Sequence, residues 1–493
     1  MRRKALQLSL LLAIPLHLAN LQAQPTPEPL IVHEWGTFTS LQNEAGQAIG
    51  GINTDDEPVP RFVHRLTDWL LLSPTEVPAN FFQGAPSCHP DVTLRLETPV
   101  LYFHLPGAWT RIPEVSVTAR FRGGWLTEFY PNALADAPGV SKDPGGFGPL
   151  RSDTVSTLAW NSLDVGGDEN GPPSNEHVWT APRGVRAGSV RTPGGEAERF
   201  LFYRGVGHID APIAVARNAV TAELVLRSHL PRELAGRESL EVKSAWLVDV
   251  DAYGAVAFRM LPALRLGGTG TDKVLLRVSG DFAPREYNEA NRERLRSSLH
   301  RALVAEGLFD DEAQALLDTW ELSYFKSAGM RVFFLVPRAW TDLYLPLSVS
   351  GHAQITRVMV GRIELVTPQQ RSNLQQIAQM PAAEVTAEAT RLRDDYYGRI
   401  GTTGPEQLRQ VNTGRQSLEE YGISVPRSYQ LYLALGRFRN ALLLDEVARR
   451  PTPALKAFID AHRLQGYRPA ETSVTARKGF STGVAAHAPT ARR

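Results

Sequence analysis

Short, largely hydrophobic segments separated by polar, turn-rich stretches dominate the chain from residue 31 to residue 284. These segments are rich in β-branched and aromatic residues, and glycine and proline separate them, which is the pattern of strands joined by turns. The clearest predicted strands are residues 101–105, 115–121, 125–130, 199–204, 222–227, 245–250, 255–260 and 274–278. Regular short strands of this kind predict a mainly antiparallel, β-sandwich-like domain over residues 31–284.

The apolar period becomes helical after residue 284. Leu295, Leu299 and Leu303 form one stripe, because residues three or four positions apart share a helix face. A second helix is expected from residue 310 to about residue 327, since three acidic residues stand where its N-terminus would lie. We therefore predict a helical insertion over residues 285–329.

Strands return after this insertion and are followed by a second helical region. Residues 330–367 are predicted to rejoin the β body, with strands at 330–336, 343–349 and 356–366. Residues 368–464 are predicted as a helical C-terminal region, and residues 465–493, which are small and polar without a period, as a disordered tail. The expected fold class is α+β.

The first 23 residues have the pattern of a secretory signal peptide. A basic start is followed by an apolar core and then by Ala23, a small residue at a plausible cleavage site. The core is about 14 residues long, shorter than the roughly 20 that span a bilayer, so cleavage is expected rather than an uncleaved anchor. A Pro-rich leader, residues 24–30, precedes the β domain, and the protein is expected in the periplasm or outside the cell.

Composition excludes several classes of function. The 493 residues are 43% hydrophobic and 21% charged, as in ordinary globular proteins, and the net charge is +1 at pH 7. Loss of the basic signal peptide would leave a slightly acidic mature chain, so nucleic acid is not an expected partner. The single cysteine, Cys88, cannot form an intramolecular disulfide. Phosphate-binding loops, nucleophile elbows and paired-cysteine motifs are absent from the sequence, which disfavours nucleotide enzymes, elbow-type hydrolases and zinc ribbons.

His33 and Glu34 are the first candidates for chemistry. They are adjacent, and neighbours on a strand point to opposite faces, so a shared site needs a local turn and a buried hydrogen-bonded pair is the default. Position 37 is threonine, so the second histidine of a zinc-protease helix is missing. We predict no metal site. The acidic loops at 53–57, 164–170 and 249–251 do not complete a calcium-binding pattern either, and they are expected to be solvated.

Glu97 and Glu128 are the second candidate pair. Each lies beside a strand rich in aromatic residues, and two carboxylates about 5 to 9.5 Å apart can act as acid and nucleophile or base in glycoside hydrolysis. The alternative is that Glu97 caps the turn before Pro99 while Glu128 faces solvent.

The third group surrounds the glycine-rich segment at residues 203–210. His208 and Asp210 could form a polarised pair on one strand face, and Arg204 could clamp a carboxylate or phosphate. The alternative is a strand that leaves the core, with Arg204 in a structural ion pair. Together with Arg204, the aromatic residues Trp35, Tyr130 and Tyr203 are candidates for ligand binding, although such residues are more often core anchors.

Several separated motifs resemble one protein family. The segment VHEWGTFTS at residues 32–40 resembles the start of the mature chain in an uncharacterised family of exported bacterial proteins. The resemblance continues, in the expected order, at residues 97–103, 126–131, 200–205, 319–320, 329–332 and 358–364. It spans about residues 31–366 and implies export and this domain layout, but it implies no activity, cofactor or catalytic residue.

The leading hypothesis is a non-catalytic binding or interaction protein of the periplasm or exterior. A small molecule, a glycan or another protein would be its partner, no integral membrane segment would remain after signal cleavage, and no cofactor is assigned. The alternative is an extracellular hydrolase that acts on polysaccharide or another polymer through the candidate carboxylates and histidines. The two hypotheses differ in whether those side chains converge in one cleft.

Overall fold

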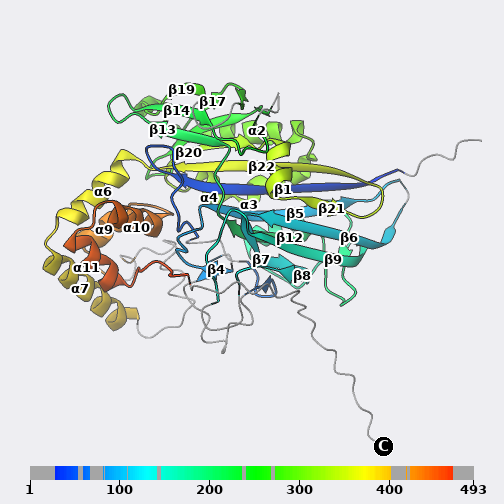
Figure 1. Cartoon of the computed structure of the whole chain (residues 1–493), viewed down its shortest axis with the longest axis horizontal. Coiled ribbons are helices and arrows are strands. Elements are labelled where there is room, and N and C mark those ends of the chain that lie inside the picture. Colours follow the sequence, from blue (N-terminus) through cyan, green and yellow to red (C-terminus); the bar gives the residue numbers. More distant parts are fainter. Residues whose placement is uncertain are drawn as a thin grey trace, which may run out of the picture.

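The computed structural model of the chain describes residues 28–53, 59–66, 81–82, 84–107, 109–140, 146–235, 240–267, 273–400, 418 and 422–469. In this part of the chain the predicted α+β class is confirmed, with a sheet-rich body and a helical C-terminal region (Figure 1). The expected signal peptide lies outside the described residues, as do most of the leader and most of the tail. No described helix is both long enough and apolar enough to cross a bilayer.

A mixed sheet of 15 strands forms the body. Its central strand, β1 (Leu30–Gln42), pairs in parallel with β22 (Ala353–Leu365) on one side and antiparallel with β5 (Leu94–His104) on the other. The path through the sheet continues from β5 through β12 (Leu201–Gly207), β7 (Gly124–Tyr130), β9 (Val155–Gly166), β10 (Val190–Arg191) and β11 (Ala197–Glu198), and from β22 through β20 (Gly329–Leu335), β16 (Ala245–Val250) and β17 (Val256–Leu261). Shorter or branching members are β2 (His64–Arg65), β6 (Arg111–Arg122), β8 (Leu134–Asp136) and β21 (Leu347–Val349).

One face of this sheet is covered by helices. These are α1 (His177–Arg183), α2 (Ala290–Ala305), α3 (Asp310–Thr319) and α4 (Glu321–Phe325). Trp35 and Val360 of the sheet share a buried cluster with the predicted stripe Leu295, Leu299 and Leu303 of α2. Successive residues of a strand point to opposite faces, so His33, Trp35, Thr37 and Thr39 of β1 all face this helical layer.

The opposite face packs against a second β layer. The three-stranded sheet of β13 (Ile213–Arg217), β14 (Glu223–Ser228) and β19 (Val274–Ser279) shares one core cluster with the inward residues of β1, β5 and β20. Figure 1 shows this small sheet along the edge of the molecule beyond β20 and β22. With an apolar layer on each side, β1 is buried at every residue except Ile31. Two further short pairs, β3 (Phe81–Phe82) with β4 (Ala85–Pro86) and β15 (Glu241–Val242) with β18 (Leu264–Arg265), stand apart.

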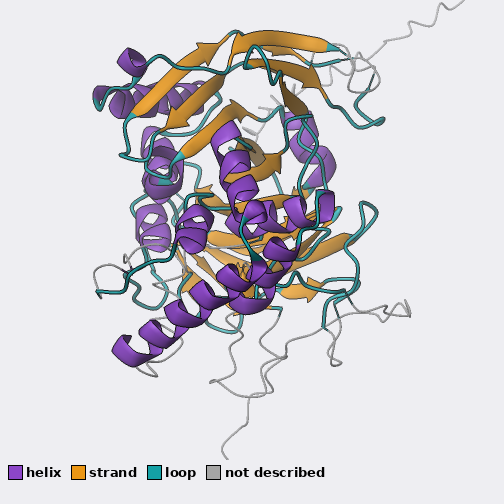
Figure 2. Cartoon of the chain, turned by 90° about the vertical axis from the view of Figure 1, so that its left-hand side faces the viewer, coloured by secondary structure: helices purple, strands orange, loops and turns teal. Residues whose placement is uncertain are grey.

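Five helices form the described C-terminal region. They are α6 (Pro368–Gln379), α7 (Ala382–Ile400), α9 (Arg427–Leu433), α10 (Arg439–Arg449) and α11 (Pro453–His462), and they are grouped in front of the sheet in Figure 2. Helix α6 begins directly after β22, where Thr367 forms a capping box with Gln370.

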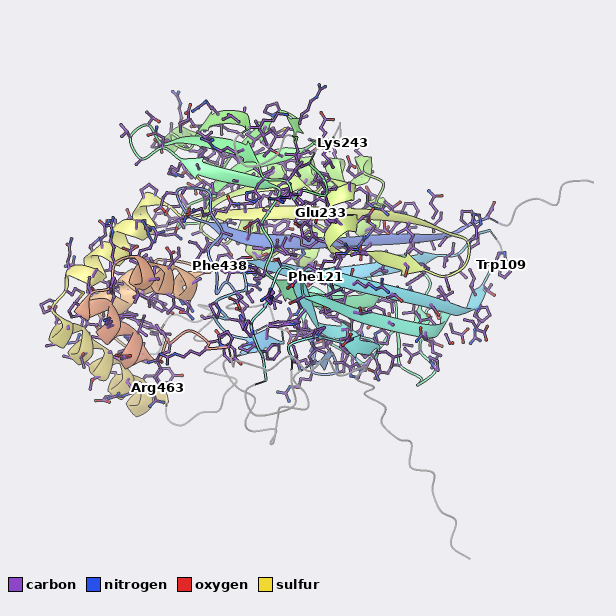
Figure 3. All side chains as sticks on the ribbon, viewed as in Figure 1. Trp109, Phe121, Glu233, Lys243, Phe438 and Arg463 are labelled. Atoms are coloured by element: carbon purple, nitrogen blue, oxygen red, sulfur yellow. The ribbon has the colours of Figure 1, made fainter. Side chains whose placement is uncertain are left out.

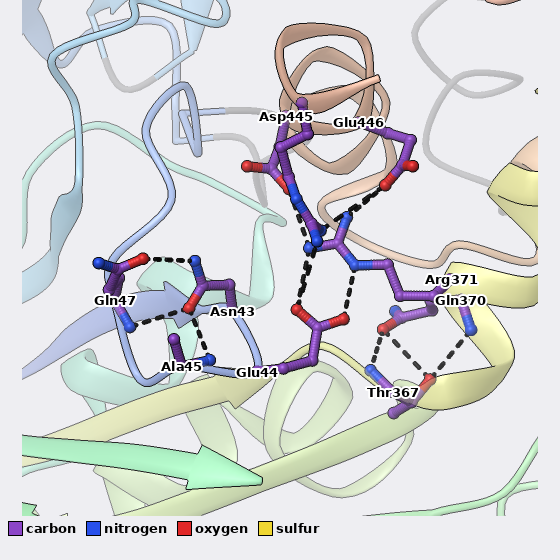
Figure 4. Close-up of polar contacts among 10 residues, drawn as sticks. Asn43, Glu44, Ala45, Gln47, Thr367, Gln370, Arg371, Asp445 and Glu446 are labelled. Carbon is purple, nitrogen blue, oxygen red and sulfur yellow. Dashed lines mark hydrogen bonds and ion pairs between the residues drawn. The ribbon is translucent and has the colours of Figure 1, made fainter. Parts of the chain in front are cut away.

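Ion pairs of Arg371 join this helical region to the body. Its guanidinium lies 2.7 Å from Glu44, in the loop after β1, and 2.9 Å from both Asp445 and Glu446 of α10 (Figure 4). Burial would lower the pKa of Arg371, but the hydrogen bonds and charges of Glu44 and Asp445 hold it above its ordinary value. A single arginine therefore bridges the loop of the central strand and two C-terminal helices.

Three elements differ from the sequence predictions. Helix α1 lies in the stretch predicted as β domain, and α5 (Arg338–Tyr344) occupies the start of the strand predicted at 343–349. Pro337 is the N-cap of α5, and the helix buries Trp340 in the core of the second face. Seven residues are too few to show a helical period in the sequence. The helix predicted from 310 to about 327 is divided at Trp320 into α3 and α4.

Candidate metal centre

Three side chains that are distant in the sequence meet on the helix-covered face of the sheet. They are His33 of β1, His104 at the end of β5, and Glu312 in the first turn of α3. One ligand atom from each lies within 4.8 Å of the other two. His33 Nδ1 is 2.7 Å from one carboxylate oxygen of Glu312, and His104 Nε2 is 2.8 Å from the other.

The sheet register and one helix cap bring these groups together. His33 pairs with Tyr102 of β5, so His104, two residues further along, points to the same face. Glu312 is the third residue of α3, and its Oε2 accepts the backbone N–H of Phe309 at 2.8 Å. This cap fixes the carboxylate between the two imidazoles.

The site is buried and its carboxylate is ionised. The side chain of Glu312 is fully buried, that of His33 is 4% exposed and that of His104 is 13% exposed. Burial would raise the pKa of Glu312, but the hydrogen bonds from His104 and His33 outweigh it and hold the pKa below its ordinary value. The ring of Phe309, 43% exposed, lies 4.6 Å from the His33 ring and 4.7 Å from the His104 ring. Phe309 therefore stands between the imidazoles and solvent.

Two imidazole nitrogens and a carboxylate form a ligand set for a divalent transition metal. Zinc binds such atoms at about 2.0–2.2 Å, and three protein ligands leave a further position for water or another molecule. A metal would replace the protons that now join each histidine to Glu312, because imidazole coordinates in its neutral form. In the described ranges, no other group of three or more His, Cys, Asp or Glu residues has this geometry.

Glu34 points away from this centre, as expected for the strand neighbour of His33. Its carboxylate forms an ion pair with Arg357 and accepts a hydrogen bond from the hydroxyl of Tyr203 on the opposite face of the sheet. Burial and the charge of Glu34 raise the pKa of Tyr203 well above its ordinary value. Glu34 and Tyr203 are thus parts of a buried structural ion-pair network.

Glu97 and Glu128 are each bound by arginines. Glu97 lies 3.1 Å from Arg95 and 2.9 Å from Arg437, while Glu128 pairs with Arg204 and lies 2.9 Å from Arg65. The alternative in which Glu128 faces solvent is wrong, because its side chain is 3% exposed.

The arginines keep both of these acids ionised. Burial would raise both pKa values, but the neighbouring positive charges lower that of Glu97 to about 2 and also depress that of Glu128. A general acid needs a raised pKa, so neither carboxylate is prepared for that role.

The remaining candidates lie apart from one another. His208 Nδ1 is 2.8 Å from the carbonyl oxygen of Asp91, and Asp210 pairs with His229 at 3.4 Å. Each side chain thus has its own partner, in place of the polarised His208–Asp210 pair that the sequence had left open. Trp35 is fully buried and Tyr130 is 3% exposed. Both belong to the core beneath the helices. Trp35, Tyr130 and Tyr203 are therefore core residues, and Arg204 is in a buried ion pair. These are the structural alternatives that the sequence analysis set beside ligand binding.

Sequence reasoning missed two of the three residues of this candidate metal centre, His104 and Glu312, and predicted no metal site. His104 lies within a predicted strand, and Glu312 belongs to the acidic start of a predicted helix, so the local pattern accounts for each residue without a ligand. Glu312 is separated from His33 by 279 positions, and only the register of β1 with β5 and the placement of α3 bring them together. The available signal was His33 itself, which the sequence had already marked as a candidate for chemistry.

The comparisons with known proteins add little. No protein-family model matches the chain, and no curated protein matches it. Among solved structures, the chain is similar to the Fcho1 Mu homology domain of Danio rerio with bound Eps15 peptide, at 10% sequence identity. That match covers 69% of this chain and 96% of the other, with a TM-score of 0.24, and a likeness of this size supports no conclusion about fold or function.

Proposed function

We propose that the protein is an exported bacterial binding protein that holds a divalent transition-metal ion, with zinc as the best match, in the periplasm or outside the cell. The observation that carries the proposal is the convergence of His33, His104 and Glu312 within 4.8 Å. Export is supported by the signal-like first 23 residues and by the family resemblance of residues 31–366.

The ligand set favours zinc over magnesium or calcium. Magnesium and calcium prefer sites made of oxygen atoms alone, whereas imidazole suits zinc and its transition-metal neighbours. Phe309 covers the imidazoles from the solvent side, which is a feature of a site that retains an ion rather than one that admits a large substrate. The polymer-hydrolase alternative has no specific contact in its favour, because Glu97 and Glu128 are both held by arginines.

Zinc titration of the purified mature chain tests this proposal. After removal of metal with a chelator, isothermal titration calorimetry should give one zinc ion per chain, with protons released on binding. His104→Gln, at the most exposed of the three ligands, should weaken binding by more than about 100-fold, because even the loss of an outer-shell partner costs about 10–100-fold.

A matched control is His64→Gln. His64 Nε2 also contacts a carboxylate, that of Glu196 at 2.9 Å, but outside the three-residue group, so this variant should bind zinc like the unaltered chain. Failure of the folded, unaltered chain to bind stoichiometric zinc, cobalt or nickel would refute the metal proposal. Equal affinity in His104→Gln would show that the ion binds elsewhere.

A further inference from the structure

A small cavity lies where the C-terminal helices meet the sheet. Its volume is about 20 Å³, and its walls are formed by β1, β20, β22, α6 and α10 with the segments next to them. Phe438, at the N-terminal end of α10, belongs to the wall and is labelled at this junction in Figure 3. The polar members of the wall are mostly charged side chains: Arg331, Arg362, Glu364 and Arg437.

Two buried arginines share one carboxylate oxygen in this wall. Arg331 Nε lies 2.9 Å from Oε1 of Glu364, and Arg362 Nε donates to the same oxygen at 2.6 Å. Both arginines are 1% exposed, and Glu364 is 7% exposed. The triad therefore buries two positive charges against one negative charge, and an uncompensated charge is costly in a protein interior.

The two arginines differ in what their remaining N–H groups do. Arg331 donates to the backbone carbonyls of Ser323, Tyr324 and Ser327 at 2.7–3.1 Å and so closes the end of α4. Arg362 Nη1 is buried and has no hydrogen-bond acceptor among the described residues. A buried cationic donor without an acceptor destabilises a protein more than a neutral donor does, because the desolvation cost of a charged group is larger.

Further positive charge surrounds the same space. Arg437 lines the cavity, and its Nη2 contacts Glu97 at 2.9 Å. Burial lowers the pKa of Arg331 to about 10, and the nearby charges of Arg362 and Arg437 add to that effect although Glu364 opposes it. The wall thus combines an unused N–H donor with an excess of cations.

We propose that this cavity binds a small monovalent inorganic anion of halide size, for which chloride is the probe. A cavity of about 10–15 Å³ or more holds one water molecule, so about 20 Å³ suits a single small ion and excludes nucleotides and sugar phosphates. The anion would accept the Nη1–H groups of Arg362 and neutralise the excess charge of the triad. Because its walls come from both the sheet and the C-terminal helices, the bound anion would stabilise their junction.

Thermal and urea unfolding of the full mature chain tests this proposal in chloride and in gluconate at equal ionic strength. Gluconate is too large for the cavity, so chloride should stabilise the protein and gluconate should not. At 100 times its dissociation constant, a ligand of the folded state shifts the unfolding equilibrium about 100-fold. Equal stability in the two salts would overturn the proposal.

Arg362→Met locates the effect. This variant leaves Arg331 and Glu364 as a neutral pair and should lose the difference between chloride and gluconate. Arg277→Met is the control, since Arg277 is 56% exposed and pairs with Glu223 on the small sheet; it should keep the difference. Persistence of the chloride effect in Arg362→Met would show an ion bound elsewhere and overturn the site.

A crystallographic measurement keeps the proposal testable if Arg362→Met does not fold. Crystals of the unaltered chain soaked in bromide should show an anomalous peak beside Arg362 Nη1. A saturating soak without a peak there would overturn the site. Stabilisation of the protein by phosphate but not by chloride would refute the proposal that the cavity binds an anion of halide size.

Discussion

Replacement of Glu97 by glutamine tests the energetic role of the buried ion pairs. The carboxylate is fully buried, lies 3.1 Å from Arg95 and 2.9 Å from Arg437, and accepts the hydroxyl of Thr39 at 2.8 Å. Glutamine keeps the shape of the side chain and removes its charge. Both arginines then lose a buried counter-charge, and the free energy of unfolding should fall.

The size of this loss follows from the pKa of Glu97. Its folded value of about 2 lies below the ordinary 4.5, and each pKa unit corresponds to about 1.36 kcal/mol, so the ionised carboxylate stabilises the fold by about 3 kcal/mol. Breaking a buried ion pair typically costs about 3–5 kcal/mol, which agrees. Because the folded pKa is depressed, this stability is present above pH 4.5 and is lost as the pH falls towards 2.

Urea unfolding followed by tryptophan fluorescence measures both effects. At pH 7, Glu97→Gln should lower the free energy of unfolding by about 3 kcal/mol, and the variant should lose less stability than the unaltered chain between pH 4.5 and the lowest accessible pH. Glu223→Gln is the control, since its pair with Arg277 is exposed and worth less than about 1 kcal/mol. A loss below about 1 kcal/mol for Glu97→Gln, or the same acid profile in variant and unaltered chain, would refute the reasoning.

Two further predictions concern the C-terminal helices and the sheet. Burial lowers the pKa of His462 to about 4 from 6.5, so the stability that its neutral form provides is complete above pH 6.5 and declines towards pH 4. His462→Phe should remove this decline, which hydrogen exchange of α11 measures. An unchanged pH profile in the variant would contradict the prediction. A Cβ at Gly205 would lie 2.1 Å from the carbonyl oxygen of Trp125, so Gly205→Ala should destabilise the protein by about 1–3 kcal/mol or more in urea unfolding. Gly398→Ala in α7, where nothing lies within 4 Å, should be neutral or stabilising, and equal losses in the two alanine variants would show that the contact is not the cause.

Local pattern was sufficient to predict much of the fold. The stripe of Leu295, Leu299 and Leu303 is buried as expected. Apolar residues that recur every three or four positions lie on one face of a helix, and that face packs against the core. Helix α5 was missed because its seven residues are too few to show a period. The order of strands in the sheet could not be predicted from local patterns either. β1 pairs with β22, more than 300 positions away, and local patterns carry no information on such distant pairings.

The candidate site was predictable only in part. The argument that His33 and Glu34 face opposite sides of one strand agrees with the structure, where each has its own partners. Glu312, the residue that joins His33 to His104, also caps its own helix. A helix cap is a sufficient reason for an acidic residue in the sequence, so nothing local marked Glu312 as a member of the candidate site.

The parallel pairing of β1 with β22 sets an order of events in the life of the chain. All 13 residues of β1 have a partner in β22, so the first described strand cannot complete its hydrogen bonds until the chain is available as far as residue 365. Until then one edge of this 13-residue strand is open, and open edges can pair with other strands. An N-terminal fragment that ends before β22 therefore cannot close the sheet around β1, and the first described strand stays open on one edge until a strand more than 300 positions away has paired with it.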